Sequence, residues 1–231
     1  MVVTLGDQIS DTTLLRVRSL AAELKLTKSP AIIDVVPAYT TVTVFYEIVP
    51  ASGGHVPPFE CIQQLVVECL KKSEHRWPEL LRENLEQDRR PEIGAGMEIP
   101  VCYGGAFGPD LDELARFAGL TAEEVIALHS QPRYDVHAVG FTPGFPYLGG
   151  LSPKLHMPRR ATPRVEVPAG SVGIGGAQTG IYPLRSPGGW QIIGRTPLNL
   201  FNVRVVPPAR LQVGDRVRFK PISLEEFWAW Q

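Results

Sequence analysis

The chain has 231 residues, of which 44% are hydrophobic and 20% are charged, a composition typical of a soluble globular protein. Its formal net charge of −1 excludes the broad basic surface that binds nucleic acids or anionic membranes. No apolar run approaches the length of a membrane-spanning helix, and the first residues lack the charged and apolar segments of a signal peptide.

The chain has three cysteines, Cys61, Cys69 and Cys102, and no C-x-x-C pair. Cys61 and Cys69 lie about two turns apart on a predicted helix, which is too far for a disulfide. The sequence therefore predicts buried reduced thiols, no metal site and a cytoplasmic protein.

The first 94 residues have the pattern of an α/β domain. Apolar runs typical of strands occupy residues 2–5, 31–36 and 41–48. A turn around Pro37 is expected to join the last two strands, and residues 50–58 are expected to form a loop.

Helical patterns alternate with these strands. One predicted helix begins at Ser10 or Asp11 and ends near Leu26, and two more cover residues 59–70 and the charged segment 78–90. With a strand-like segment at 96–103, the order β-α-β-β-α-β resembles a ferredoxin-like domain.

Residues 95–231 are expected to form a second domain, so that the whole chain is an α+β protein. Two short helices, 111–118 and 122–129, follow candidate capping boxes that pair Asp110 with Glu113 and Thr121 with Glu124. From Pro132 onward, short strands alternate with turns until a final helical turn at 224–230, a pattern that predicts a barrel or sandwich.

The segment 140–194 carries twelve glycines and eight prolines among residues that can form a core. Glycines at barrel corners would explain this composition, and so would glycines that let a ligand or partner approach the backbone. Its run GSVGIGGAQTG (170–180) fits neither a dinucleotide fingerprint, because Gln178 stands at the third glycine, nor a P-loop.

Polar and aromatic residues in this segment are candidates for binding. Gln178, Thr179 and Tyr182 suit a lactam or carboxamide, because an amide both donates and accepts; alternatively, Gln178 bonds a turn. A carboxylate or phosphate could be bound by the arginines Arg159, Arg160, Arg164 and, further along, Arg195. Alternatively, these side chains are solvated or pair with Glu166. The segment also carries five large rings, too many to bury entirely, so some of them are expected to stay exposed as a partner-binding patch; they are Phe141, Phe145, Tyr147, Tyr182 and Trp190.

Several motifs together resemble one family. They are VVPAY (35–39), IPVCYGG (99–105), FGPDL (107–111), GFTPGFPYLGGL (140–151), PRRATPR (158–164), VPAGSVGIGGAQTGIYP (167–183), SPGGWQIIGRTPL (186–198) and GDRVRF (214–219). These runs resemble the family of the 5-oxoprolinase B subunit, also called the KipI-type kinase inhibitor or allophanate hydrolase subunit 1 family. One departure is Ala106, where the family often has an acid.

The resemblance implies a fold and a function. It implies a cyclophilin-like β-barrel for the second domain, and the B subunit of an ATP-dependent 5-oxoprolinase that works with the A and C subunits. It places Arg159 and Arg164 within a family motif. The alternatives are an inhibitor of a sensor histidine kinase and a carboxyltransferase-like subunit of a urea or allophanate pathway. The sequence assigns no catalytic residue.

Overall fold

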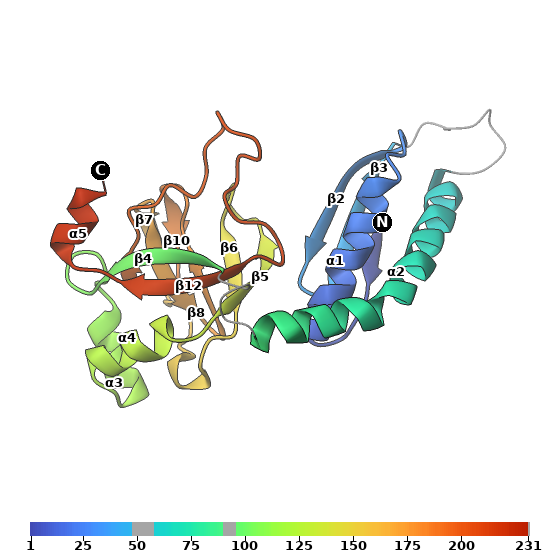
Figure 1. Cartoon of the computed structure of the whole chain (residues 1–231). Coiled ribbons are helices and arrows are strands. Elements are labelled where there is room, and N and C mark those ends of the chain that lie inside the picture. Colours follow the sequence, from blue (N-terminus) through green and yellow to red (C-terminus); the bar gives the residue numbers. More distant parts are fainter. Residues whose placement is uncertain (48–57, 90–95, 231) are drawn as a thin grey trace. The chain divides into compact units, whose positions relative to one another are not determined.

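The computed structural model describes residues 1–47, 58–89 and 96–230, apart from the side chains of residues 58 and 78–89 (Figure 1). The chain divides into two compact units, Met1–Gly94 and Ala95–Gln231. Across the described ranges, no helix combines the length and the apolar character needed to cross a membrane.

The first unit is a three-stranded antiparallel sheet with two helices. Its elements are β1 (Val2–Thr4), α1 (Asp11–Leu26), β2 (Ile32–Ala38), β3 (Thr41–Tyr46) and α2 (Pro58–Arg89), with the strand order β1-β3-β2. Ser10 caps α1 as expected, because its hydroxyl accepts the Thr13 N–H at 3.2 Å. The apolar faces of α1 and α2 pack against the sheet around Leu20 and Val44.

Three predictions for this unit need correction. The two helices expected at 59–70 and 78–90 are one helix, α2, which bends along its length (Figure 1). The turn between β2 and β3 lies beyond Pro37, where Tyr39 has a φ of 53°, and Pro37 sits within the edge strand β2. The strand expected to complete the ferredoxin-like order, β4 (Met97–Tyr103), belongs to the barrel of the second unit. The loop expected at 50–58 lies almost wholly outside the described residues.

The second unit is built on a closed barrel with the strand order β11-β4-β12-β5-β6-β9-β8. β12 and β4 are parallel and the other pairs are antiparallel. Its elements after β4 are α3 (Leu111–Ala118), α4 (Ala122–Ser130), β5 (Tyr134–Val139), β6 (Pro146–Gly149), η1 (Pro153–Leu155), β7 (Arg164–Val167), β8 (Ser171–Gly175), β9 (Gln178–Ile181), β10 (Ser186–Gly188), β11 (Gln191–Arg195), β12 (Arg216–Pro221) and α5 (Leu224–Ala229). The helices predicted at 111–118 and 122–129 and the terminal helical turn are confirmed.

The barrel interior is filled by alternate side chains of its strands, including Ile99, Val136 and Phe219. α3 and α4 lie beside one another at one side of the barrel and pack on β11 and β12 respectively (Figure 1). The pair β7–β10 forms a separate ribbon. The capping box of Thr121 and Glu124 at α4 is confirmed, whereas the Asp110 side chain makes no capping bond to α3.

Candidate functional site

Strand alternation gives β8 two different faces. Val172 and Ile174 point into the barrel core, whereas Gly173 and Gly175 face outward. A Cβ atom on Gly173 would lie 3.2 Å from Trp190 Cβ, and one on Gly175 would lie 2.5 Å from ring atom Cε2 of Trp190. Of the two explanations for the glycines, corners therefore do not apply to Gly173 and Gly175, which lie within a strand that an indole ring covers.

The outer side of β6, β9, β8 and β11 carries a second apolar cluster, which we call the aromatic face. Its members are Phe145, Tyr147, Val167, Tyr182, Trp190 and Ile192. Phe145 is central, because its ring meets Tyr182 edge-to-face at a centroid distance of 5.1 Å and Trp190 at 5.4 Å. The aromatic face is thus held together by ring-to-ring packing over a glycine floor.

The expectation that the five rings of the predicted patch are not all buried holds, although three of them are buried. Phe145, Tyr182 and Trp190 are buried in the aromatic face, and Tyr147 is half-buried. Phe141 is 66% exposed, at a backbone φ of 64°, and its ring contacts Phe145 at a centroid distance of 5.7 Å. The rings are buried because they pack on one another outside the barrel, a second core that the sequence pattern does not reveal.

Asp110 is the electrostatic centre beside this face. Its carboxylate is buried, and Oδ1 accepts Arg164 Nη2 at 2.6 Å and Arg160 Nη1 at 3.2 Å. Oδ2 accepts the backbone N–H of Ile192 at 2.6 Å. Asp110 therefore ties the arginine segment 158–164 to β11, a role that a helix cap would not provide.

The predicted alternative that Glu166 pairs with these arginines is wrong. Glu166 pairs with Arg185, at 3.2 Å, and both side chains are largely exposed. Arg164 also donates to Trp190 O at 3.5 Å, and Gln191 Nε2 donates to Pro158 O at 2.9 Å. The segment 158–164 is therefore fixed against β11 by several independent polar contacts.

Arg159 differs from its neighbours. Its side chain is exposed, and its guanidinium carbon lies 5.7 Å from the centroid of the Trp190 ring, a cation–π distance. Burial raises the pKa of the Tyr147 and Tyr182 phenols, and the positive charge of Arg159 opposes that rise at both. The two phenols therefore stay neutral near pH 7 and keep their O–H groups.

Gln178 lies on the same outer side. It is paired across the β8–β9 hairpin with Gly175, and two residues along β9 Gly180 is paired with Tyr147. Paired residues of a sheet share a face, so Gln178 and Tyr147 both point to the side that Trp190 covers. The rim of the aromatic face thus carries an amide, a phenol and, at Arg159, a cation.

Two predicted site residues lie elsewhere. Arg195 donates from Nε to Ala169 O at 2.8 Å, and its guanidinium lies over the Phe107 ring at 5.7 Å. Thr179 is fully buried inside the barrel. Neither residue shares the aromatic face with Arg159 and Gln178.

Thr179 belongs to a buried polar chain that the sequence analysis missed. Its hydroxyl donates to Gly173 O at 3.0 Å and so accepts from His129 Nε2, at 2.9 Å. His129 Nδ1 then accepts the Tyr103 hydroxyl at 2.8 Å. Burial lowers the pKa of His129 to about 3, so the ring is neutral at pH 7. A lone histidine at the end of a helix gives no sequence signal of this role.

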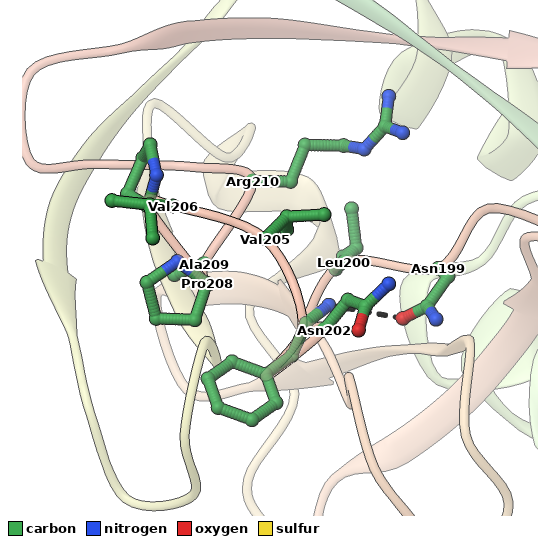
Figure 2. Close-up of a pocket in the computed structure, with 10 residues that line it drawn as sticks. Asn199, Leu200, Asn202, Val205, Val206, Pro208, Ala209 and Arg210 are labelled. Atoms are coloured by element: carbon green, nitrogen blue, oxygen red, sulfur yellow. Dashed lines mark hydrogen bonds between the residues drawn. The ribbon is translucent and has the colours of Figure 1, made fainter.

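The loop 199–210 encloses a separate hollow of about 340 Å³ (Figure 2). Its two amides serve the loop itself, because Asn199 Oδ1 accepts the Phe201 N–H at 3.1 Å and Asn202 Oδ1 accepts the Arg204 N–H at 2.9 Å. The remaining lining is apolar except for Arg210. The rim of the aromatic face combines a phenol, an amide and the exposed cation of Arg159, and we take it as the candidate ligand site.

This chain is a closed barrel with an arginine-lined outer face, preceded by a small α/β unit. Its residues 1–211 match the carboxyltransferase domain family, subdomains C and D. Among characterised proteins, the 5-oxoprolinase B subunit of Bacillus subtilis is 42% identical over 236 residues, covering 100% of this chain and 92% of its own length. The 5-oxoprolinase B subunits of Haemophilus influenzae and Escherichia coli O157:H7 are 53% and 45% identical, over 65% and 85% of this chain and 67% and 81% of their own lengths. The chain belongs to the family of the 5-oxoprolinase B subunit.

Solved structures agree with this placement. The crystal structure of TTHA0988 has a TM-score of 0.76 at 34% identity and covers 96% of this chain, which corresponds to 39% of that longer chain. PH0987 of Pyrococcus horikoshii is 40% identical with a TM-score of 0.58, over 98% of this chain and 95% of its own. The Kluyveromyces lactis urea amidolyase, at 19% identity and a TM-score of 0.67, covers 99% of this chain and 14% of its own; it shares the fold.

Proposed function

We propose that this chain is the B subunit of an ATP-dependent 5-oxoprolinase and that, with the A and C subunits, it opens 5-oxo-L-proline to L-glutamate. The observation that carries the proposal is the 42% identity to a 5-oxoprolinase B subunit over the full length of this chain. The rim of the aromatic face supports it, because a phenol, an amide and a cation suit a small cyclic amide that carries a carboxylate.

The chemistry explains why several subunits would share the work. An unstrained lactam resists hydrolysis, and transfer of a phosphoryl group from ATP to the lactam oxygen turns that oxygen into a leaving group. The rim offers groups for recognition and orientation, namely Tyr147, Gln178 and Arg159. We assign binding and orientation to this chain and the handling of ATP to the partner subunits, with the active site at their interface.

We also propose that the protein is cytoplasmic, with a ferredoxin-like first unit and a cyclophilin-like second unit. The unpaired cysteines Cys61, Cys69 and Cys102 favour a reducing compartment, the cytoplasm. The order β1-β3-β2 supports a ferredoxin-like first unit from which the fourth strand is missing among the described residues. The closed barrel supports a cyclophilin-like second unit.

A carboxyltransferase-like role in a urea or allophanate pathway is the second candidate. It is favoured by a 32% identity to a putative urea carboxylase of Emericella nidulans, although that match covers 43% of this chain and 8% of the other.

Co-purification decides between these roles. The chain is co-expressed with the A and C subunits of a 5-oxoprolinase, and the purified complex is assayed for ATP hydrolysis with 5-oxoproline, with urea and with allophanate. ATP hydrolysis that is stimulated by 5-oxoproline, but not by urea or allophanate, supports the proposal. Activity with urea or allophanate, or a complex formed only with a histidine kinase, contradicts it.

A further inference from the structure

The three arginines of segment 158–164 do not have equal freedom. Arg160 and Arg164 both donate to Oδ1 of the buried Asp110, at 3.2 and 2.6 Å. Arg164 also reaches a backbone carbonyl of Trp190. These two guanidinium groups already have carboxylate partners, and moving either onto a ligand would leave Asp110 buried with less compensation.

Arg159 has no such partner. Within residues 1–47, 58–77 and 96–230, whose side chains the structure describes, no hydrogen bond or ion pair engages its guanidinium. The group lies over the Trp190 ring at 5.7 Å with its side chain exposed. An arginine stacked on an aromatic ring keeps its five N–H donors available in the plane of the guanidinium.

The charge around Arg159 also favours an anion. Arg159, Arg160 and Arg164 share one carboxylate, that of Asp110, and the nearby Glu166 is taken by Arg185. The described part of this surface therefore carries an excess of positive charge. An anionic group docking at the rim would meet this charge beside the neutral hydroxyl of Tyr147 and the amide of Gln178.

We propose that Arg159 binds the anionic group of the ligand at the aromatic face, and that this group is the carboxylate of a small cyclic amide. This inference rests on the proposed function and deepens it. Arg160 and Arg164 then serve as the frame that presents Arg159, which reverses the expectation that Arg164 is itself a ligand-binding residue. Two sources could supply an anion in this enzyme, the carboxylate of 5-oxoproline and the phosphates of ATP.

The test uses the reconstituted complex with wild type, Arg159→Ala, Arg159→Lys and, as a matched control, Arg185→Ala. Arg185 is exposed on the same unit and pairs with Glu166. KM is measured separately for 5-oxoproline and for ATP, and each variant is also assayed with 5-oxoprolinamide, which lacks the carboxylate charge. Thermal unfolding of each free chain checks the fold.

We expect Arg159→Ala to raise the KM for 5-oxoproline about 10–100-fold, the loss typical of one charge-assisted contact. The KM for ATP and the Tm should not change. The variant should also lose its preference for 5-oxoproline over 5-oxoprolinamide, Arg159→Lys should recover part of it, and Arg185→Ala should match wild type.

Each contrary outcome has a distinct meaning. If the wild-type complex acts on 5-oxoproline and Arg159→Ala leaves the KM for 5-oxoproline unchanged, the assignment of Arg159 is overturned while the proposed function stands. A rise in the KM for ATP instead shows that the anion is a phosphate and also overturns it. A wild-type complex that does not act on 5-oxoproline overturns the proposed function, and the assignment with it.

Discussion

The indole of Trp190 lies directly against the backbone of Gly175, so close that a Cβ atom there would fall 2.5 Å from ring atom Cε2. No real Cβ contact is that short, and the ring has little room to retreat because it is buried against Phe145. The glycine and the tryptophan are thus a complementary pair on which the aromatic face depends.

Gly175→Ala should therefore displace the Trp190 ring and destabilise the protein by about 1–3 kcal/mol, the usual cost of overpacking. Gly189→Ala is the matched control, because a Cβ there would meet its nearest atom, Pro163 Cγ, at an ordinary 3.6 Å. Urea unfolding of the two variants gives the comparison. Equal stability of Gly175→Ala and Gly189→Ala would show that the ring can move aside at no cost.

Asp110 should matter for stability as well as for the frame of Arg159. Asp110→Ala removes the acceptor of Arg160, Arg164 and the buried Ile192 N–H. Leaving such donors without a partner costs about 1–3 kcal/mol. Asp112→Ala, an exposed acid in the first turn of α3, should cost less than about 1 kcal/mol. Chemical denaturation measures both, and an Asp110→Ala protein as stable as Asp112→Ala would mean that the carboxylate anchors nothing.

His129 should make the protein sensitive to acid. Its pKa is about 3 in the folded state and near 6.5 when unfolded, so below pH 6.5 only the unfolded chain takes up the proton. Stability is therefore fully present above pH 6.5 and falls as the pH drops toward 3, by up to about 1.4 kcal/mol per pH unit from this group.

The pH dependence is measured by urea unfolding between about pH 7 and pH 4.5, a range that covers the upper part of the window between the two pKa values. His129→Gln keeps a polar group but removes the titration, so its stability should fall less steeply with acid than that of wild type. His75→Gln, at an exposed histidine of α2, serves as control and should follow wild type. Parallel curves for wild type and His129→Gln would show that His129 does not set the acid sensitivity.

Much of the fold follows from local sequence signals. The cap of α1 at Ser10 and the capping box at Thr121 are correct because side-chain capping depends on neighbouring residues only. The assignment of β4 to a ferredoxin-like sheet is wrong because the apolar pattern of residues 96–103 fits either sheet, and the choice depends on distant partners in β11 and β12. The turn at Pro37 is misplaced because an edge strand tolerates proline.

The sequence predicts only part of the site, because local signals mark single residues but not the distant partners they contact. The segment containing Arg159, Tyr147 and Gln178 stands out in the sequence, and the structure brings these residues to one rim. The pairing of Arg164 with Asp110 spans 54 positions, so no spacing rule could reveal it. Glycines at 173 and 175 look like turn residues until the ring that lies on them is known.

The proposed function makes this chain one part of a shared 5-oxoprolinase active site. The direct measurement is phosphate release that depends on 5-oxoproline, with glutamate quantified in parallel, for the chain alone, for the partner subunits alone and for the reconstituted complex. Turnover is expected only when all subunits are present. Robust turnover by this chain alone, or by the partners at the same rate without it, would show that the active site is not shared.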